Sequence, residues 1–164
     1  MIDYIFDETQ HASSIPATGY LYTRPDDPVL DMLLTKAIFN KANGNEYEQL
    51  ILSFEGYEYD SDAICSDLYK NKHTKRACSL FAKVAQLIVE HTHAQLVYAV
   101  HSNTSNLHAH YIINSVRMDD GRKVQLTKKS LLFLKSSINL VLQEHGFSTI
   151  RSRYDPNNYF LITE

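Results

Sequence analysis

The sequence contains few cysteines and no long apolar run. Its 164 residues include two cysteines, Cys65 and Cys78, which are far apart and not arranged in a CxxC motif. They do not form a metal-type pair and indicate free thiols in a reducing cytosol, with a structural disulfide as the less expected alternative. There is no stretch of about 18 apolar residues and no basic, apolar leader, so we expect neither a membrane span nor a secretion signal.

An excess of basic residues is also missing. The chain has 16 Lys and Arg against 19 Asp and Glu, which gives a net charge of -3 and a pI near 6.2. Strong nonspecific nucleic-acid binders usually carry a basic excess. The charges are segregated, however, with basic runs at 70–76, 122–123, 128–129 and 151–153 and acidic ones at 26–27, 46–62 and 119–120. Such a surface allows one basic groove for single-stranded DNA, although each run alone is more typical of a solvated surface.

Residues 1–164 are predicted to form a single domain, because no internal repeat or low-complexity linker divides them. Asp27 and Pro28 form the cap and first turn of a helix that continues to Phe39. Thr127 caps another helix, which Gly146 ends. A helix is also predicted over 74–91, strands over 47–54 and within 97–116, and a return strand over 124–126 after the Asp-Gly turn at 118–122. These elements predict an α/β fold.

The most informative segment is Val97–Val116, where three histidines accompany two runs of apolar, β-branched residues. Side chains two residues apart in a strand point to the same face, so His108 and His110 should project together, while His101 ends the preceding strand. A hairpin would bring the three imidazoles within reach of one divalent ion. Three neutral imidazoles leave positions open for water and phosphate oxygens, as a catalytic metal site requires. The alternative is a set of structurally bonded histidines on a hairpin.

This segment resembles the metal motif of relaxases, the plasmid mobilisation nucleases of the MobA/MobL type in the HUH endonuclease superfamily. Their pattern reads roughly His-x-Asp-x-x-His-x-His-x-His-x-x-x-Asn. The chain matches it with His101, His108, His110 and Asn114, while Asn103 replaces the usual acid and Asn106 replaces a frequent extra histidine. The resemblance implies an α+β fold with a central antiparallel sheet flanked by helices, and Mn²⁺ or Mg²⁺ as the ion. Histidine ligands also accept other first-row metals.

The resemblance assigns the nucleophile to Tyr4, in the segment Asp3-Tyr4-Ile5. A phenol has a pKa of about 10 and needs a neighbouring cation or base to react as the phenolate. Tyr20 and Tyr22 are the next candidates, and a tyrosine beside apolar residues is also typical of a core. In the family a strand precedes this tyrosine, so we expect that strand to be absent or replaced, for example by Tyr159–Ile162.

Four further polar residues are expected to support the site or to bind DNA. Asn114 should lie on the same strand face as His110, where it would contact an imidazole or a phosphate, or else bond to local backbone. Asn103 is likewise expected to support the metal ligands or to contact DNA. Lys128 and Lys129 would hold DNA phosphates, with a solvated helix start as the alternative. His91 and His93 form another His-x-His, but helical spacing places them at a helix end, where a structural role is expected.

The function implied is nicking of one DNA strand at the transfer origin of a plasmid or integrative element. Attack by tyrosine would give a 5′-phosphotyrosyl intermediate. The implied partners are single-stranded DNA and accessory mobilisation proteins, without a membrane, in the bacterial cytoplasm. One alternative is a catalytically weak accessory or replication-initiation protein of the same fold. Another is an unrelated metal-binding protein with no preference for single-stranded DNA.

Overall fold

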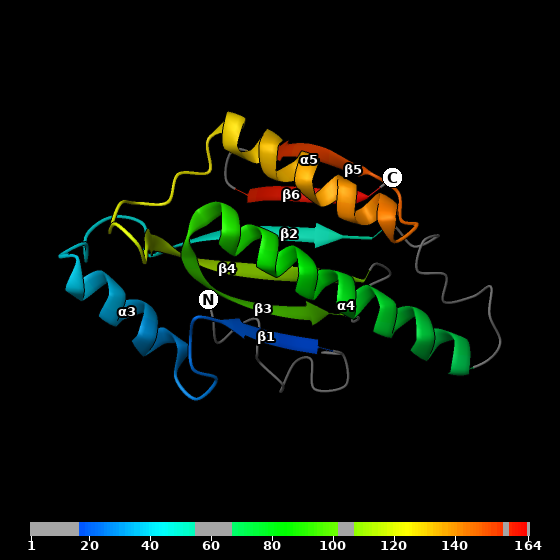
Figure 1. Ribbon diagram of the computed structural model, residues 1–164, viewed down its shortest axis with the longest axis horizontal. Coiled ribbons are helices and arrows are strands. Elements are labelled where there is room, and N and C mark those ends of the chain that lie inside the picture. Colours follow the sequence, from blue (N-terminus) through cyan, green and yellow to red (C-terminus); the bar gives the residue numbers. More distant parts are fainter. Residues whose placement is uncertain (1–16, 55–66, 102–106, 156–157, 164) are drawn as a thin grey trace.

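The computed structural model describes residues 17–54, 67–101, 107–155 and 158–163 (Figure 1). Six strands in these ranges form one sheet in the order β1-β3-β4-β2-β6-β5. They are β1 (Ala17–Leu21), β2 (Tyr47–Ser53), β3 (Ala94–His101), β4 (His108–Arg117), β5 (Ile150–Asp155) and β6 (Asn158–Thr163). Every neighbouring pair is antiparallel except β2 and β6, which are parallel. The predicted α+β fold with a central antiparallel sheet is therefore confirmed, with one parallel pair added.

Helices α4 (Asp67–Thr92) and α5 (Lys128–Glu144) lie side by side across one face of the sheet (Figure 1). Between them and the strands is the main hydrophobic core, in which Leu50, Leu52 and Phe81 have no exposed surface. Tyr111 is also buried there, and its hydroxyl donates a hydrogen bond to the carbonyl oxygen of Phe81 at 3.1 Å. This bond satisfies a polar group that would otherwise be costly to bury. The core fixes β4 against α4.

Helix α3 (Pro28–Ile38) packs on the opposite face of the sheet. Its start is as predicted, since the Asp27 side chain accepts a hydrogen bond from the Leu30 amide at 2.9 Å. Met32 packs in a small cluster with Val97, Ala99 and Ile112. The apolar residues that gave the helix its periodicity are instead exposed, among them Leu30, Leu33, Leu34 and Ile38. The helix predicted after Asp27 is therefore confirmed, while most of its leucines face away from the sheet.

Two other predicted elements differ from the structure. The helix predicted over residues 74–91 begins seven residues earlier, at Asp67. The return strand predicted over 124–126 is wrong, because pairing after the turn is limited to a bridge between Val116 and Lys123. Val124 and Leu126 are buried in the main core instead. The chain therefore leaves β4 after Lys123 and packs its apolar side chains under the helices. Helix α5 follows, and its N-cap is Thr127 as predicted.

The segment Tyr159–Ile162 forms most of β6 and pairs with β2 on the side away from β4. The sequence indicated this segment as a substitute strand, and the structure confirms that it joins the sheet. None of the helices in the described ranges is both long and apolar enough to cross a lipid bilayer.

Candidate metal centre

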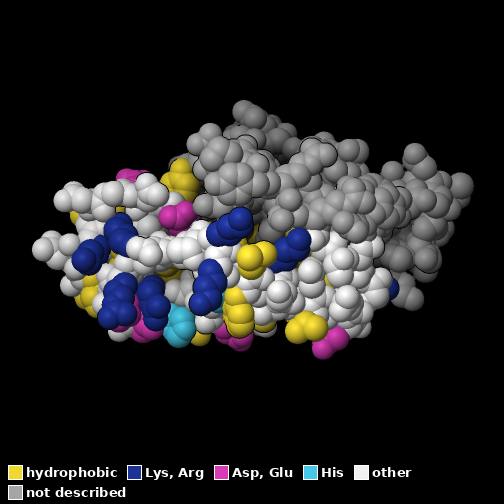
Figure 2. All heavy atoms as spheres, turned by 90° about the horizontal axis from the view of Figure 1, so that it is seen from above, with side chains coloured by type: hydrophobic (Ala, Val, Ile, Leu, Met, Phe, Trp, Pro, Cys, Tyr) yellow, Lys and Arg dark blue, Asp and Glu magenta, His cyan; other side chains and the backbone are white. Residues whose placement is uncertain are grey.

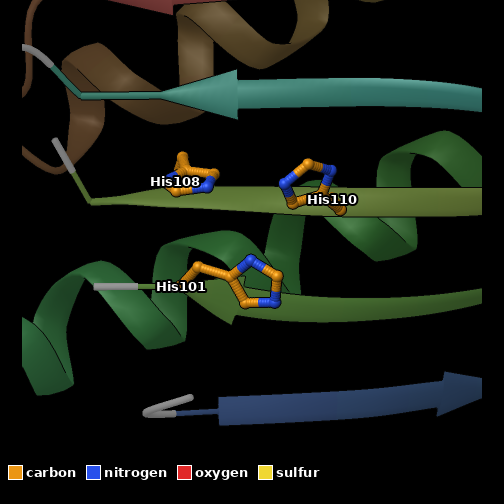
Figure 3. A group of neighbouring side chains, drawn as sticks. All are labelled: His101, His108 and His110. Carbon is orange, nitrogen blue, oxygen red and sulfur yellow. The ribbon is translucent and has the colours of Figure 1, made fainter. Parts of the chain in front are cut away.

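The side chains of the three predicted histidines point toward one another at the end of the sheet where β3 stops and β4 starts (Figure 3). One ring nitrogen of each lies within 4.8 Å of the corresponding nitrogens of the other two. Ring centroids are 5.0 to 5.4 Å apart. Two nitrogens bound to one ion at about 2.1 Å each are at most about 4.2 Å apart. Small rotations of the side chains would therefore suffice to bind a first-row divalent ion.

Strand geometry explains this convergence. His108 and His110 are two residues apart on β4 and share a face, and His101 stands opposite His108 in the antiparallel register. The face is the one that carries α3, away from α4 and α5. His101 is 2 % exposed, whereas His108 and His110 are partly exposed. The cluster thus has a buried base and an accessible side.

The electrostatics of the cluster favour neutral imidazole. Burial lowers the pKa of His110 to about 4, and the nearby His108 and His101 act in the same direction. A ligand imidazole must be neutral before a metal can bind it. Near pH 7, no proton therefore competes with a metal for His110. The donor set fits a divalent first-row ion, which would be held by His101, His108 and His110.

Gln49 is a site residue that the sequence analysis missed. Its Nε2 lies 3.0 Å from Nδ1 of His110. Gln49 reaches this ring because β2 pairs with β4, placing Ile51 opposite His110 and Gln49 opposite Ile112. The alternation of Gln49, Ile51 and Ser53 with buried Leu50 and Leu52 would have assigned Gln49 to the second face of β2. Sequence alone did not indicate which strand lies beside it.

The contact between Gln49 and His110 can select the ring tautomer. Rotation of the amide by 180° exchanges its oxygen and nitrogen, which have nearly the same shape. With Oε1 towards the ring, Gln49 accepts from Nδ1–H and leaves the lone pair of Nε2 for a metal. With NH₂ towards the ring, Gln49 donates to Nδ1, and Nε2 then carries the proton. Metal binding through Nε2 of His110 requires the first arrangement.

Replacing Gln49 with Leu is therefore expected to weaken Mn²⁺ binding by about 10- to 100-fold. Gln49→Glu should retain most of the affinity, since a carboxylate also accepts from Nδ1–H. Titration calorimetry measures the affinity, and ¹⁵N NMR of the His110 ring reports the tautomer with and without metal. Gln143→Leu, an exposed position on α5, is the matched control. If Gln49→Leu changes neither the Mn²⁺ affinity nor the tautomer of His110, Gln49 does not select the tautomer.

The structure places Asn114 on the predicted face but gives it other partners. Its Nδ2 donates to the carbonyl oxygen of Met32 at 3.1 Å and to Oε1 of Gln95 at 2.8 Å. Four residues of strand separate Asn114 from His110, which corresponds to about 13 Å. The amide thus links α3 to the sheet, and the side chain bonded to the His110 ring is Gln49. Within the described residues, the buried Oδ1 of Asn114 has no hydrogen-bond partner.

The remaining predicted residues are separated from the histidines or lie outside the described ranges. Lys128 and Lys129 are exposed at the start of α5, beyond the Arg117 end of β4, and α5 covers the other face of the sheet. Tyr4 and Asn103 lie outside the described residues. The structure therefore brings together the three histidines but not the two lysines.

The two alternative tyrosines lie on or near β1. Tyr20 stands opposite Val97 and packs with the cluster around Met32. Val97 is four residues before His101 on β3, a distance of about 13 Å. Tyr22 is 70 % exposed and has a positive φ of 58°. Neither position adjoins the three histidines.

The second His-x-His lies at the end of α4, as its helical spacing predicted. The ring of His91 stacks on Phe133, with centroids 5.4 Å apart. Nδ1 of His93 lies 3.1 Å from a carboxylate oxygen of Asp119. Both side chains have structural partners away from the metal centre.

Comparison with known proteins agrees with this arrangement. A family model described as the nuclease domain of MobA/VirD2-like relaxases matches residues 4–147. Two proteins from Staphylococcus aureus, both named Protein rlx, are 29% identical over 114 residues and 27% identical over 134 residues. These alignments cover 70% and 79% of the chain but 31% and 36% of the relatives. The chain thus spans about a third of the length of these relatives, and no solved structure matches it. Since the family model covers most of the sequence, the chain belongs to the MobA/VirD2-like relaxase nuclease family.

Proposed function

We propose that this chain nicks one strand of DNA at the transfer origin of a plasmid or integrative element, as an HUH-type relaxase. The observation that carries the proposal is the convergence of three histidine nitrogens within 4.8 Å in a chain of the relaxase family. Mn²⁺ or Mg²⁺ is the proposed ion, held by His101, His108 and His110. When bound, it would polarise a phosphate oxygen and accept developing negative charge.

The protein groups have distinct roles in this proposal. His101, His108 and His110 would hold the ion, which would supply Lewis-acid activation of the phosphate, and Gln49 would orient the ring of His110. The Tyr4 hydroxyl loses its proton, and its oxygen attacks the scissile phosphorus. A Tyr4 O–P bond forms as the P–O3′ bond breaks, and the departing 3′ oxygen takes up a proton. The product is a 5′-phosphotyrosyl link and a free 3′-hydroxyl, so rejoining by the reverse step needs no nucleotide cofactor.

Two observations support the assignment of Tyr4. The family match begins at residue 4, so this tyrosine lies within the matched domain. The alternatives lie farther along the sheet: Tyr20 is opposite Val97, four residues before His101, and Tyr22 follows the end of β1. Asn103 is retained in the proposal as a residue that supports the ligands or contacts DNA, and Lys128 and Lys129 as contacts to phosphates away from the nick.

The test is formation of a covalent protein–DNA adduct on single-stranded oligonucleotides from transfer origins. We expect a band of reduced mobility on a denaturing gel with Mn²⁺, and its loss with a chelator. Duplex DNA of the same sequence is the control and should react poorly. Metal binding without any adduct on a panel of origin sequences would favour the alternative, a catalytically weak accessory or replication-initiation protein.

A further inference from the structure

A second group of cationic side chains surrounds a cavity at the end of the sheet opposite the histidines. The cavity has a volume of about 540 Å³ and lies where α4 ends, β4 ends and α5 begins. Among the described residues, its lining includes four basic ones, Lys41, Arg117, Arg122 and Lys123, and no acidic one. Figure 2 shows Lys and Arg side chains over the left half of that view, with a few Asp and Glu side chains among them. The net charge of -3 therefore conceals a local positive region.

The charges around this cavity are only partly neutralised. Arg117 is bound to Asp119 at 2.6 Å, and Arg122 lies 3.6 Å from Asp120 with a side chain that is 82% exposed. Within the described part of the chain, no carboxylate forms an ion pair with Lys41 or Lys123. The same holds for Lys128 and Lys129 at the start of α5. Arg117 also lies 3.3 Å from Asp120, so the cations of this region without a carboxylate partner among the described residues are Lys41, Lys128 and Lys129.

The loop that carries these charges is held in place by Lys123. Its Nζ donates to the carbonyl oxygens of Asn45 at 3.1 Å and Lys41 at 3.4 Å, and to Oγ of Ser115 at 3.2 Å. These three bonds fix Lys123, whose ammonium also interacts electrostatically with the carboxylate of Glu48. Lys41 and Arg122 project into solvent from the lining. The lining thus combines one cation held by hydrogen bonds with two exposed cations.

The chemistry of the lining selects phosphate rather than bases. His91 is the one aromatic ring in the lining, and it is already stacked on Phe133. Proteins that read bases in single strands offer free aromatic faces, whereas Lys and Arg contact phosphate oxygens without regard to sequence. We propose that this cavity is a second DNA-binding site, which takes backbone phosphates away from the metal centre. The assignment of DNA as the ligand rests on the proposed function.

The position of the cavity sets the extent of bound DNA. His108 opens β4 and Arg117 closes it, so about 30 Å separate the metal centre from the cavity. A strand stacked as in a duplex advances about 3.4 Å per nucleotide and a less stacked single strand advances further, so at most about nine nucleotides would span that distance. DNA that reaches both sites must therefore be longer than a segment confined to the nick. Contacts at the cavity should increase affinity without altering the chemistry at the histidines.

The experiment measures binding of a labelled single strand of about 30 nucleotides by fluorescence anisotropy, with chelator present and at several salt concentrations. We expect Lys41→Gln/Arg122→Gln to weaken binding by about tenfold at low salt. The slope of log K against log salt should become shallower by about 1.4, since each phosphate contact on a single strand contributes about 0.7. The control, Lys83→Gln/Lys135→Gln, removes the same charge from an exposed position on α4 and a partly exposed position on α5, both outside the basic runs, and should lose less than about twofold.

Two results would overturn the inference. Equal losses in both double variants would show an effect of overall charge, and no loss in either would show that DNA does not reach the cavity. A titration with inorganic phosphate alone separates a free anion from DNA as the ligand. Submillimolar phosphate binding that is lost in Lys41→Gln/Arg122→Gln, with DNA affinity unchanged, would assign the cavity to a small anion instead. Because the binding assay needs neither metal nor cleavage, its result can be interpreted even if the protein does not nick DNA.

Discussion

Replacing Tyr4 with Phe is expected to abolish the covalent protein–DNA adduct while leaving Mn²⁺ binding unchanged. The substitution removes the hydroxyl oxygen that would bond to phosphorus and preserves the ring, so a packing role would be retained. Loss of a nucleophile that forms a covalent intermediate should lower the rate by at least about 1,000-fold. Denaturing gels quantify the adduct, and titration calorimetry measures the metal affinity of the same preparation.

Tyr20→Phe and Tyr22→Phe are the matched controls for this prediction. Tyr20 packs with the cluster around Met32, and Tyr22 lies beyond the end of β1, so neither substitution should reduce the adduct by more than about twofold. An adduct that persists in Tyr4→Phe and disappears in one of the other variants would move the nucleophile to that tyrosine. Loss of metal binding in Tyr4→Phe would instead point to a structural role near the histidines.

Replacing His108 with Ala is expected to reduce Mn²⁺ affinity by more than about 100-fold and to abolish the adduct. Removing a direct ligand should cost more than removing a residue that orients one, for which 10- to 100-fold is typical. His108 is chosen because it is partly exposed, whereas His101 is 2% exposed and its loss would also leave a cavity. Titration calorimetry measures the affinity, and circular dichroism verifies the fold.

His93→Ala is the control for the metal prediction, because this exposed imidazole contacts Asp119 and lies at the end of α4. It should leave metal affinity and adduct formation within about twofold of the wild type. Unchanged Mn²⁺ affinity in His108→Ala would contradict a centre built from the three histidines. Loss of affinity with retained DNA nicking would mean that the reaction does not depend on this ion. A metal centre in a protein with no preference for single-stranded DNA would favour the unrelated metal-binding alternative.

The histidine cluster was predictable from sequence because it depends on local geometry. His108 and His110 share a face in any strand, since successive side chains alternate. A short connection between two neighbouring strands then makes an antiparallel hairpin, which brings His101 beside them. The caps of α3 and α5 were predictable for the same reason, because Asp27 and Thr127 accept hydrogen bonds from amides three residues ahead.

Contacts between distant segments decided the rest. Gln49 reaches His110 because β2 pairs with β4, and the parallel β6 joins the other side of β2. Asn114 bonds to Met32 because α3 packs at its end of the sheet, and to Gln95 because β3 pairs with β4. Sequence alternation assigns a side chain to a face, but the partner on that face depends on which strands and helices pack together. The sequence by itself determined the three histidines as a set, and the tertiary structure decided that Gln49 contacts the ring of His110 and that the basic cavity lies at the opposite end.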